Sequence, residues 1–247
     1  MHRDDDEHLM FYDHNDYGFE VNKKNQINDC FNCEITCINN DPKKILNFPY
    51  CDKTRSLFLC RFDMRFIFQD EIDLYYDSLL KKLSHLGRLT LNCCYLPHFP
   101  ESICQLKQLK KLYINYGDLE SIPESIGNLL HLQHLDLNRN KLKSLPESIC
   151  NLKQLRILYV DCNNLTSLPE SMGQLIQLRE LDLCENELTH LPDSMHKLKY
   201  LRELDVRRNN FTTNPLPNYL LKLVQSSEMS KTGFVEKQMK RLDKRFK

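Results

Sequence analysis

The sequence predicts an α/β solenoid, in which parallel strands and short helices alternate along one array of repeats. Two observations support this prediction. A proline recurs every 23 residues, at Pro100, Pro123, Pro146, Pro169, Pro192 and Pro215. A leucine recurs with the same period, at Leu89, Leu112, Leu135, Leu158, Leu181 and Leu204. Self-similarity at a fixed period of this length is typical of solenoids, and we expect the array to occupy residues 86–217.

Each repeat begins with a predicted strand. In Leu135-Asp136-Leu137 two apolar residues flank a polar one, which is the alternation of a strand with one buried face. Two leucines cannot form a core alone, so the strands must stack on one another to bury them. We therefore expect six parallel strands, near residues 89–91, 112–114, 135–137, 158–160, 181–183 and 204–206.

An asparagine follows each of the later strands, at Asn140, Asn163, Asn186 and Asn209. An inward-facing amide at the bend after a strand can hydrogen-bond backbone groups that the sheet leaves unpaired. The first two repeats differ, since Cys94 and Gly117 stand at this position. We expect the bend at Gly117 to be looser or differently built.

A short helical turn is predicted to close each repeat, as in Pro146-Glu-Ser-Ile149-Cys-Asn-Leu152. Proline suits the first helical position, because its φ angle is fixed there and its missing N–H is not needed. The glutamate that follows is favoured by the positive end of the helix dipole. Ile149 and Leu152 are three residues apart and should face the core.

The full pattern, L-x-x-L-x-L-x-x-N-x-L-x-x-L-P, resembles the leucine-rich repeat. It is clearest in LPESICNLKQLRILYVDCNNLTS, which starts at Leu145. The resemblance is to the widespread intracellular class with 23-residue repeats and an LPxxIxxL segment, found in bacterial effectors, Ras-pathway scaffolds and plant intracellular repeat proteins. It covers roughly half of the chain. It implies a curved horseshoe with a parallel sheet on the concave side, short helices on the convex side, and a role in binding proteins.

Both ends of the array are predicted to carry caps. Residues 51–85 read as an N-terminal cap with a degenerate first repeat, because Phe66 and Phe68 lie one period before Leu89 and Leu91. Residues 218–247 read as a C-terminal helical cap with an apolar stripe and interspersed lysines. We do not expect this basic helix to contact a membrane. Residues 1–50 begin with an acidic stretch and are interpreted as a weakly ordered or accessory arm.

Overall charge and cysteine content limit the functional classes. The chain has 247 residues, with 34 basic and 34 acidic side chains, so no global field favours nucleic acid or membrane. It lacks an apolar run long enough to span a bilayer and the basic-then-apolar order of a secretory signal. It has 11 cysteines, an odd number that cannot all pair within the chain, and this favours a reducing cytoplasm as its location. If the protein is a secreted effector, this would be the cytoplasm of a host cell.

Cys30 and Cys33 have the spacing of half a zinc site, but Cys37 and Cys51 do not form the second close pair that such a site needs. We interpret them as ordinary cysteines and expect no metal or cofactor.

No sequence motif indicates an enzyme. The chain has no P-loop, GxGxxG, HExxH or GxSxG segment. Two pairs of residues could be imagined as nucleophile sites: Cys162 with His134, and Cys184 beside Asp182. Both would lie open to solvent on a rigid sheet without oxyanion donors, so we expect no catalysis.

The residues between the strand leucines are predicted to line the concave face and to bind a protein partner. Large tyrosines stand among sorted charges, with basic residues at one end and carboxylates at the other. The acidic end favours a partner with a basic patch. The predicted partner-binding residues are Arg88, Lys111, Tyr113, Tyr116, His134, Asp136, Tyr159, Asp161, Glu180, Asp182, Glu203, Asp205 and Arg207.

Two interpretations of this binding stay open. In the first, a monomeric binder blocks a functional surface of its partner, as a secreted bacterial effector or effector antagonist would. In the second, the repeats belong to an adaptor that recruits other machinery through the N-terminal arm or the C-terminal helix. A chain lacking residues 1–50 separates them, because only an adaptor would keep its affinity and lose its effect.

Overall fold

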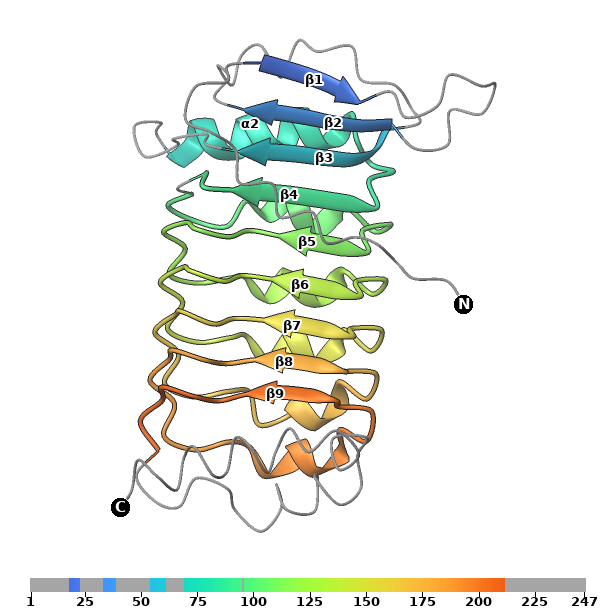
Figure 1. Cartoon of the computed structure of the whole chain (residues 1–247). Coiled ribbons are helices and arrows are strands. Elements are labelled where there is room, and N and C mark those ends of the chain that lie inside the picture. Colours follow the sequence, from blue (N-terminus) through green and yellow to red (C-terminus); the bar gives the residue numbers. More distant parts are fainter. Residues whose placement is uncertain (1–17, 23–32, 39–53, 61–68, 95, 212–247) are drawn as a thin grey trace.

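One sheet of nine strands organises the molecule (Figure 1). The structure is a computed structural model that describes residues 18–22, 33–38, 54–60, 69–94 and 96–211. The strands lie in the sheet in sequence order, from β1 to β9. They are β1 (Gly18–Asn22), β2 (Cys33–Ile38), β3 (Thr54–Cys60), β4 (Arg88–Asn92), β5 (Lys111–Tyr113), β6 (His134–Asp136), β7 (Ile157–Tyr159), β8 (Glu180–Asp182) and β9 (Glu203–Asp205).

The predicted array is confirmed in its strands and in their register. Strands β4 to β9 pair in parallel, each with the next along the chain. Leu135 pairs with Leu158, and Leu158 pairs with Leu181, so equivalent leucines stand in one row across the sheet. Each strand begins one residue earlier than expected.

The core is a continuous stack of these leucines between the sheet and the short helices behind it (Figure 1). Leu112, Leu135, Leu158 and Leu181 are at most 1% exposed. No repeat closes its own core, because each leucine is covered by the equivalent leucines of the repeats on either side. Neighbouring repeats therefore stabilise one another, as in other solenoids.

The helical turns are 3-10 helices: η1 (Glu101–Gln105), η2 (Glu124–Asn128), η3 (Glu147–Asn151), η4 (Met172–Gln174) and η5 (Asp193–Lys197). Ile149 and Leu152 are both fully buried, as expected for residues three apart in a helix with three residues per turn. The proline lies one position earlier than predicted. Pro146 precedes the helix in an extended conformation, and its carbonyl oxygen accepts the first helical hydrogen bond from Ile149 at 3.1 Å.

The N-terminal end differs from its prediction. The strand that pairs with β4 is β3, in which Leu57 and Leu59 lie opposite Leu89 and Leu91. The expected role of Phe66 and Phe68 in this pairing is therefore wrong, and both lie outside the described residues. Helix α2 (Gln69–Lys81) takes the place of a short helix in this first repeat and buries Leu79 and Leu80. A longer connection is needed to hold its 13 residues.

Two strands in the predicted N-terminal arm extend the sheet. Strands β1 and β2 form an antiparallel pair, and β2 runs parallel to β3. These stretches of residues 1–50 are therefore part of the sheet. The predicted C-terminal cap lies outside the described residues.

The asparagines form a ladder that ties each repeat to the preceding one. The Asn163 side-chain nitrogen donates to the carbonyl oxygens of Leu137 and Val160, at 3.0 and 3.1 Å. Its side-chain oxygen accepts a hydrogen bond from the Leu142 N–H at 3.0 Å. Asn140, Asn186 and Asn209 repeat this arrangement. The predicted role of the amide at the bend is thus confirmed.

The first two bends keep the same backbone although their side chains differ. The residue before the asparagine position has a left-handed backbone in every repeat, with φ of 54° at Cys93, 55° at Tyr116 and 55° at Arg139. The Cys94 thiol donates to the Leu59 carbonyl oxygen at 3.6 Å, which is the role of an asparagine amide in later repeats. The Gly117 N–H still bonds to the Arg139 carbonyl oxygen at 3.0 Å. The bend at Gly117 is therefore not looser in its backbone.

We predict that Asn163→Ala destabilises the protein by about 2 kcal/mol or more, because buried backbone groups of two repeats lose their partners. Asn164→Ala is the matched control, since the Asn164 side chain is exposed and contacts only Glu187, at 3.4 Å. Urea denaturation followed by circular dichroism measures both. Equal midpoints for the two variants would show that the ladder contributes nothing to stability.

Candidate functional site

The 3-10 helices cover one face of the sheet and leave the opposite face of the strands free of helices (Figure 1). We call this opposite face of β4 to β9 the open face. Its residues flank the buried leucines, and in β5, β7 and β8 a half-buried residue stands on each side of the leucine. The regular register places equivalent residues in straight rows across the strands.

Three ring side chains form a row at the centre of the open face. The ring centroids of Tyr113 and His134 are 4.6 Å apart, and those of His134 and Tyr159 are 5.6 Å apart. We call Tyr113, His134 and Tyr159 the aromatic row. Arg88 lies over the Tyr113 ring, with its guanidinium carbon 4.9 Å from the centroid. At the other end, the Tyr159 hydroxyl donates to Glu180. The row therefore lies between a cation and a carboxylate.

The electrostatics of the row follow from this packing. Burial, followed by the nearby charges of Lys111 and Arg88, lowers the pKa of His134 to about 4. Its ring is therefore neutral at physiological pH. Burial and the Glu180 hydrogen bond raise the pKa of Tyr159, so this hydroxyl keeps its proton and acts as a donor.

Carboxylates occupy the β7 to β9 end of the open face. We call Asp161, Glu180, Asp182, Glu203 and Asp205 the acidic patch. Burial, followed by the charges of Asp161 and Asp205, raises the pKa of Asp182 to about 6. Burial also raises the pKa of Asp161. The carboxylates of Asp161 and Asp182 are therefore poorly solvated, and they repel each other when both are ionised.

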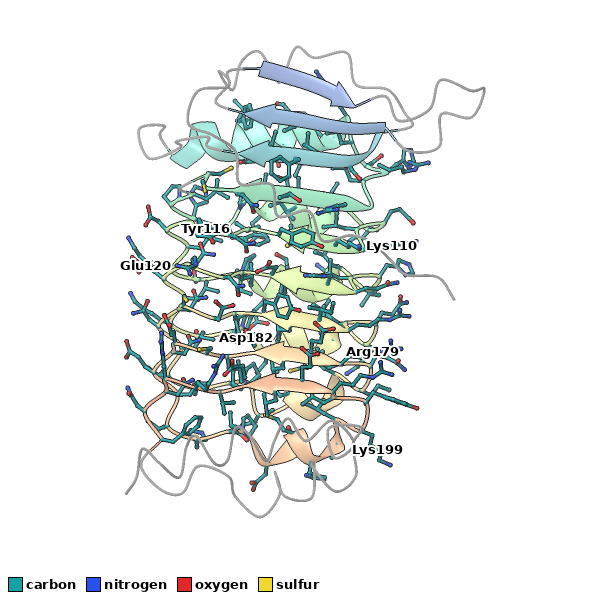
Figure 2. The ribbon with its side chains drawn as sticks, viewed as in Figure 1. Lys110, Tyr116, Glu120, Arg179, Asp182 and Lys199 are labelled. Carbon is teal, nitrogen blue, oxygen red and sulfur yellow. The ribbon has the colours of Figure 1, made fainter. Side chains whose placement is uncertain are left out.

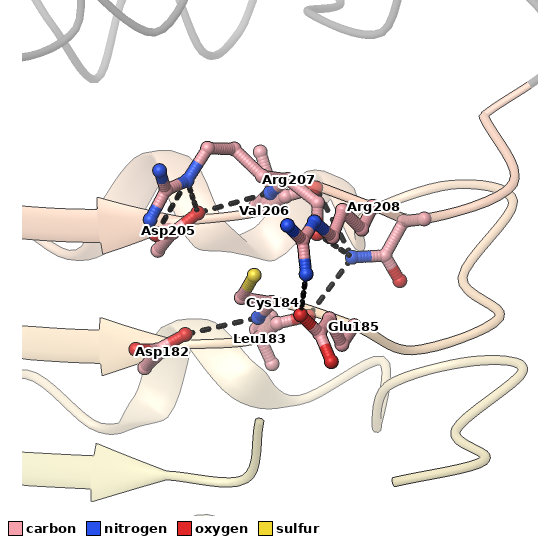
Figure 3. A network of polar contacts seen from close by, with 9 residues as sticks. Asp182, Leu183, Cys184, Glu185, Asp205, Val206, Arg207 and Arg208 are labelled. Atoms are coloured by element: carbon pink, nitrogen blue, oxygen red, sulfur yellow. Dashed lines mark hydrogen bonds and ion pairs between the residues drawn. The ribbon is translucent and has the colours of Figure 1, made fainter. Parts of the chain in front are cut away.

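Hydrogen bonds hold the acidic patch in place (Figure 3). The Cys184 N–H donates to the Asp182 carboxylate at 2.9 Å. The Arg207 backbone N–H donates to Asp205 at 3.0 Å, and its guanidinium forms an ion pair with the same carboxylate. Arg207 thus neutralises one carboxylate of the patch and leaves Asp182 without a cation of its own among the described residues.

Two predicted binding residues are placed differently from our expectation. Asp136 is only 9% exposed, and it accepts a hydrogen bond from the Asn115 amide at 2.9 Å. Burial raises the pKa of Asp136 to about 6. Tyr116 lies at the left-handed bend after β5, away from the aromatic row, and it stacks with Arg139 at 5.1 Å. Hydrogen bonds from the Asn115 amide and the Asn138 N–H hold Asp136 in its buried position, and the bend turns Tyr116 toward the edge of the sheet (Figure 2).

Sequence reasoning missed the charged pairs at this bend. Arg208 forms an ion pair with Glu185, and both have the left-handed backbone of the repeat (Figure 3). The 23-residue period would have placed Arg139, Glu185 and Arg208 in one row if the bend had been included among the candidate positions.

Cys162, at the left-handed bend after β7, and Cys184, after β8, have the properties of unreactive thiols. Burial, and hydrogen bonding to Glu185, raise the pKa of Cys162 to about 12. Burial, followed by the charges of Asp205 and Asp182, raises the pKa of Cys184 to about 11. A nucleophilic cysteine needs a lowered pKa, so the structure gives no support to a nucleophile at either position.

Among the residues with described side chains, no group of three His, Cys, Asp or Glu side chains is arranged to hold a metal ion. Cys30 and Cys51 lie outside the described residues, as do the side chains of Cys33 and Cys37. Within the described part of the chain, none of the helices is both long enough and apolar enough to cross a bilayer.

Comparison with protein families identifies the repeats. A model of the leucine-rich repeat region matches residues 67–182, and a model of the single leucine-rich repeat matches residues 177–198. No curated protein matches the chain.

Solved structures with a similar fold come from bacteria and plants. A leucine-rich repeat protein of Leptospira interrogans is 28% identical, with a TM-score of 0.56 over 77% of this chain and 52% of that one. The ectodomain of the receptor kinase GASSHO1/SCHENGEN3 from Arabidopsis thaliana, in complex with CASPARIAN STRIP INTEGRITY FACTOR 2, is 30% identical, with a TM-score of 0.57 over 69% of this chain and 20% of that one. An internalin of Listeria monocytogenes shares the fold at 18% identity, with a TM-score of 0.54 over 71% of this chain and 53% of that one.

The chain thus spans about half of the Leptospira protein and a fifth of the plant ectodomain. The family models, the parallel register and the similar solved structures agree on one assignment: the chain is a leucine-rich repeat protein.

Proposed function

We propose that this protein binds a protein partner on its open face and blocks a functional surface of that partner, as an effector or inhibitor would. The observation that carries the proposal is the aromatic row, which lies directly beside the acidic patch on a rigid sheet. The partner would present an apolar or cationic group to the aromatic row and a basic patch to the carboxylates.

The aromatic row suits an interface because its side chains are already ordered. The Tyr113 ring packs against the His134 ring, and Tyr159 is fixed by its hydrogen bond to Glu180. Tyrosine is enriched among the residues that contribute most to binding energy. Docking onto ordered side chains loses little conformational entropy. We therefore expect Tyr113 and Tyr159 to be the anchors.

The acidic patch supports a basic partner. The carboxylate of Asp182 is half-buried beside Asp161 and Asp205, and its ionised form is disfavoured in the free protein. A cation from the partner would replace the missing solvation and relieve this repulsion. Complementary charge at an interface raises the association rate and excludes partners of the wrong sign.

The open face is large enough for such a complex. Six strands spaced about 4.8 Å apart span roughly 25 Å across the sheet. This width suits a standard interface of about 800 Å² on each partner. A plant receptor ectodomain of similar fold was solved in complex with CASPARIAN STRIP INTEGRITY FACTOR 2, which supports a binding role for this fold.

We predict that the affinity for the partner falls as the pH is lowered from about 7 to about 5. Protonation of Asp182, whose pKa is about 6, removes a negative charge that the basic partner needs. His134, with a pKa of about 4, stays neutral over most of this range and does not offset the loss. Surface plasmon resonance at several pH values measures the effect.

Asp182→Asn should reduce this pH dependence, and Asp193→Asn is the matched control, since Asp193 is exposed on η5 behind the sheet. Identical pH profiles for the wild type and Asp182→Asn would contradict a role for this carboxylate.

The adaptor alternative depends on residues 1–50 and 218–247, of which only β1 and β2 are described. We therefore place it second. The chain lacking residues 1–50 tests it.

A further inference from the structure

We propose that a second surface of this protein docks on an anionic lipid membrane. This surface is the edge of the sheet at which the strands begin, and it is separate from the open face. We call it the strand-entry edge. It consists of the turns that lead into β5 to β9, which are residues 105–110, 128–133, 151–156, 174–179 and 197–202.

The backbone aligns one residue from each of these turns in a straight row. The Gln133 N–H donates to the Lys110 carbonyl oxygen at 2.8 Å, and the Arg156 N–H donates to the Gln133 carbonyl oxygen at 2.8 Å. The same bond links Arg179 to Arg156 and Arg202 to Arg179, each at 2.7 Å. Four of the five residues in this row are basic, and they stand at the spacing of neighbouring strands.

Four of the five turns of the strand-entry edge carry lysine or arginine. Its turns read QLKQLK, NLLHLQ, NLKQLR, QLIQLR and KLKYLR, and they contain no aspartate or glutamate. In the described part of the chain, Lys110, Arg156 and Arg179 form no ion pair. The opposite edge differs, because Lys141 and Lys143 are paired there with Asp118 and Glu120. Figure 2 shows Lys110, Arg179 and Lys199 on one side of the sheet, and Tyr116 and Glu120 on the other.

Apolar side chains stand between these cations. Leu130 is 57% exposed, Ile176 is 50% exposed, and both occupy the repeat position that holds Lys107, Lys153 or Lys199 in the other turns. Tyr200 is 54% exposed in the last of the turns. These three are among the five large apolar side chains that are exposed in the described residues, so they are concentrated at this edge.

A lipid surface matches both features of the edge. Lysines and arginines are attracted to the negative potential of anionic headgroups. Leucine, isoleucine and tyrosine side chains at the same level can enter the boundary between headgroups and acyl chains. Nucleic acid would use the positive charges and leave Leu130 and Ile176 in water. The straight row also suits a locally flat surface, because the backbone ladder holds Lys110, Arg156, Arg179 and Arg202 in line.

Co-sedimentation of the full chain with vesicles tests the proposal. The wild type should bind vesicles of phosphatidylcholine with phosphatidylserine and should not bind vesicles of phosphatidylcholine alone. The triple variant Lys153→Gln, Arg156→Gln, Arg179→Gln should lose at least about tenfold in vesicle affinity. The double variant Leu130→Ser, Ile176→Ser has unchanged charge and should bind vesicles more weakly. This result would distinguish insertion of apolar side chains into the membrane from electrostatic attraction alone.

A variant of the opposite edge, Arg139→Gln, Lys141→Gln, Lys143→Gln, is matched in charge and should bind like the wild type. Thermal unfolding by circular dichroism confirms that each variant folds. The proposal is overturned if the wild type ignores phosphatidylserine, or if both triple variants lose affinity equally. It is also overturned if the Leu130 and Ile176 variant binds vesicles normally, because the edge would then be a surface for a polyanion or an acidic protein.

Discussion

Leu158→Ala should lower the free energy of unfolding by about 2–5 kcal/mol, which is the usual cost of removing a buried leucine side chain from a packed core. Leu158 is fully buried at the centre of the array, between Leu135 and Leu181. The repeats on both sides hold the backbone in register. The structure therefore cannot collapse into the cavity as a chain end could.

Ile157→Ala is the matched control for this prediction. Ile157 is the preceding residue of β7, but it lies on the open face and is only half-buried. We expect its substitution to cost less than about 1 kcal/mol, because little apolar area leaves the core. Urea denaturation curves with equal m-values allow the comparison. A cost below about 1 kcal/mol for Leu158→Ala would show that the row of leucines is not the core.

The array itself could be predicted from the sequence because its physical determinants recur. The period of Leu89 to Leu204 determines which residues stack, and parallel pairing follows once they do. The asparagine ladder was also predictable, since the bend leaves backbone groups that a nearby amide can reach. The family models match these same residues.

The first repeat could not be predicted in the same way. Leu57 and Leu59 lie farther from Leu89 than one period, because helix α2 is inserted between them. A search at the constant period therefore placed Phe66 and Phe68 in the strand. Strands β1 and β2 carry no repeat signal, and they extend the sheet by pairing with each other and with β3.

The open face was predicted only in part. Alternation along each strand identified the rows, but it could not show how neighbouring side chains cover one another. Asp136 is buried, whereas Tyr113 and Tyr159 are only half-buried on the open face. The strand-entry edge was not predicted, because its cations lie in the turns, outside the strand alternation that identifies the open face.

The second large effect concerns binding. The variant Tyr113→Ala, Tyr159→Ala, Asp182→Lys should bind the partner at least about 100-fold more weakly than the wild type. The two tyrosine substitutions remove the anchors of the aromatic row. The lysine reverses the charge of a carboxylate that a basic partner needs. Circular dichroism establishes first that the variant is folded.

The matched control is Tyr116→Ala, Tyr200→Ala, Asp193→Lys. It removes two exposed tyrosines and reverses one carboxylate, as the first variant does, but all three residues lie off the open face. We expect its affinity to stay within about threefold of the wild type, since substitutions away from an interface cost little.

The partner is first captured on the wild-type chain and identified by mass spectrometry. Isothermal titration calorimetry of this partner with the wild type, the open-face variant and the control then tests most directly whether the open face is the binding surface. The open-face variant should show little or no heat of binding, while the wild type and the control bind alike. Undiminished binding by the open-face variant, or a loss confined to the control, would place the partner on another surface and contradict the proposed function.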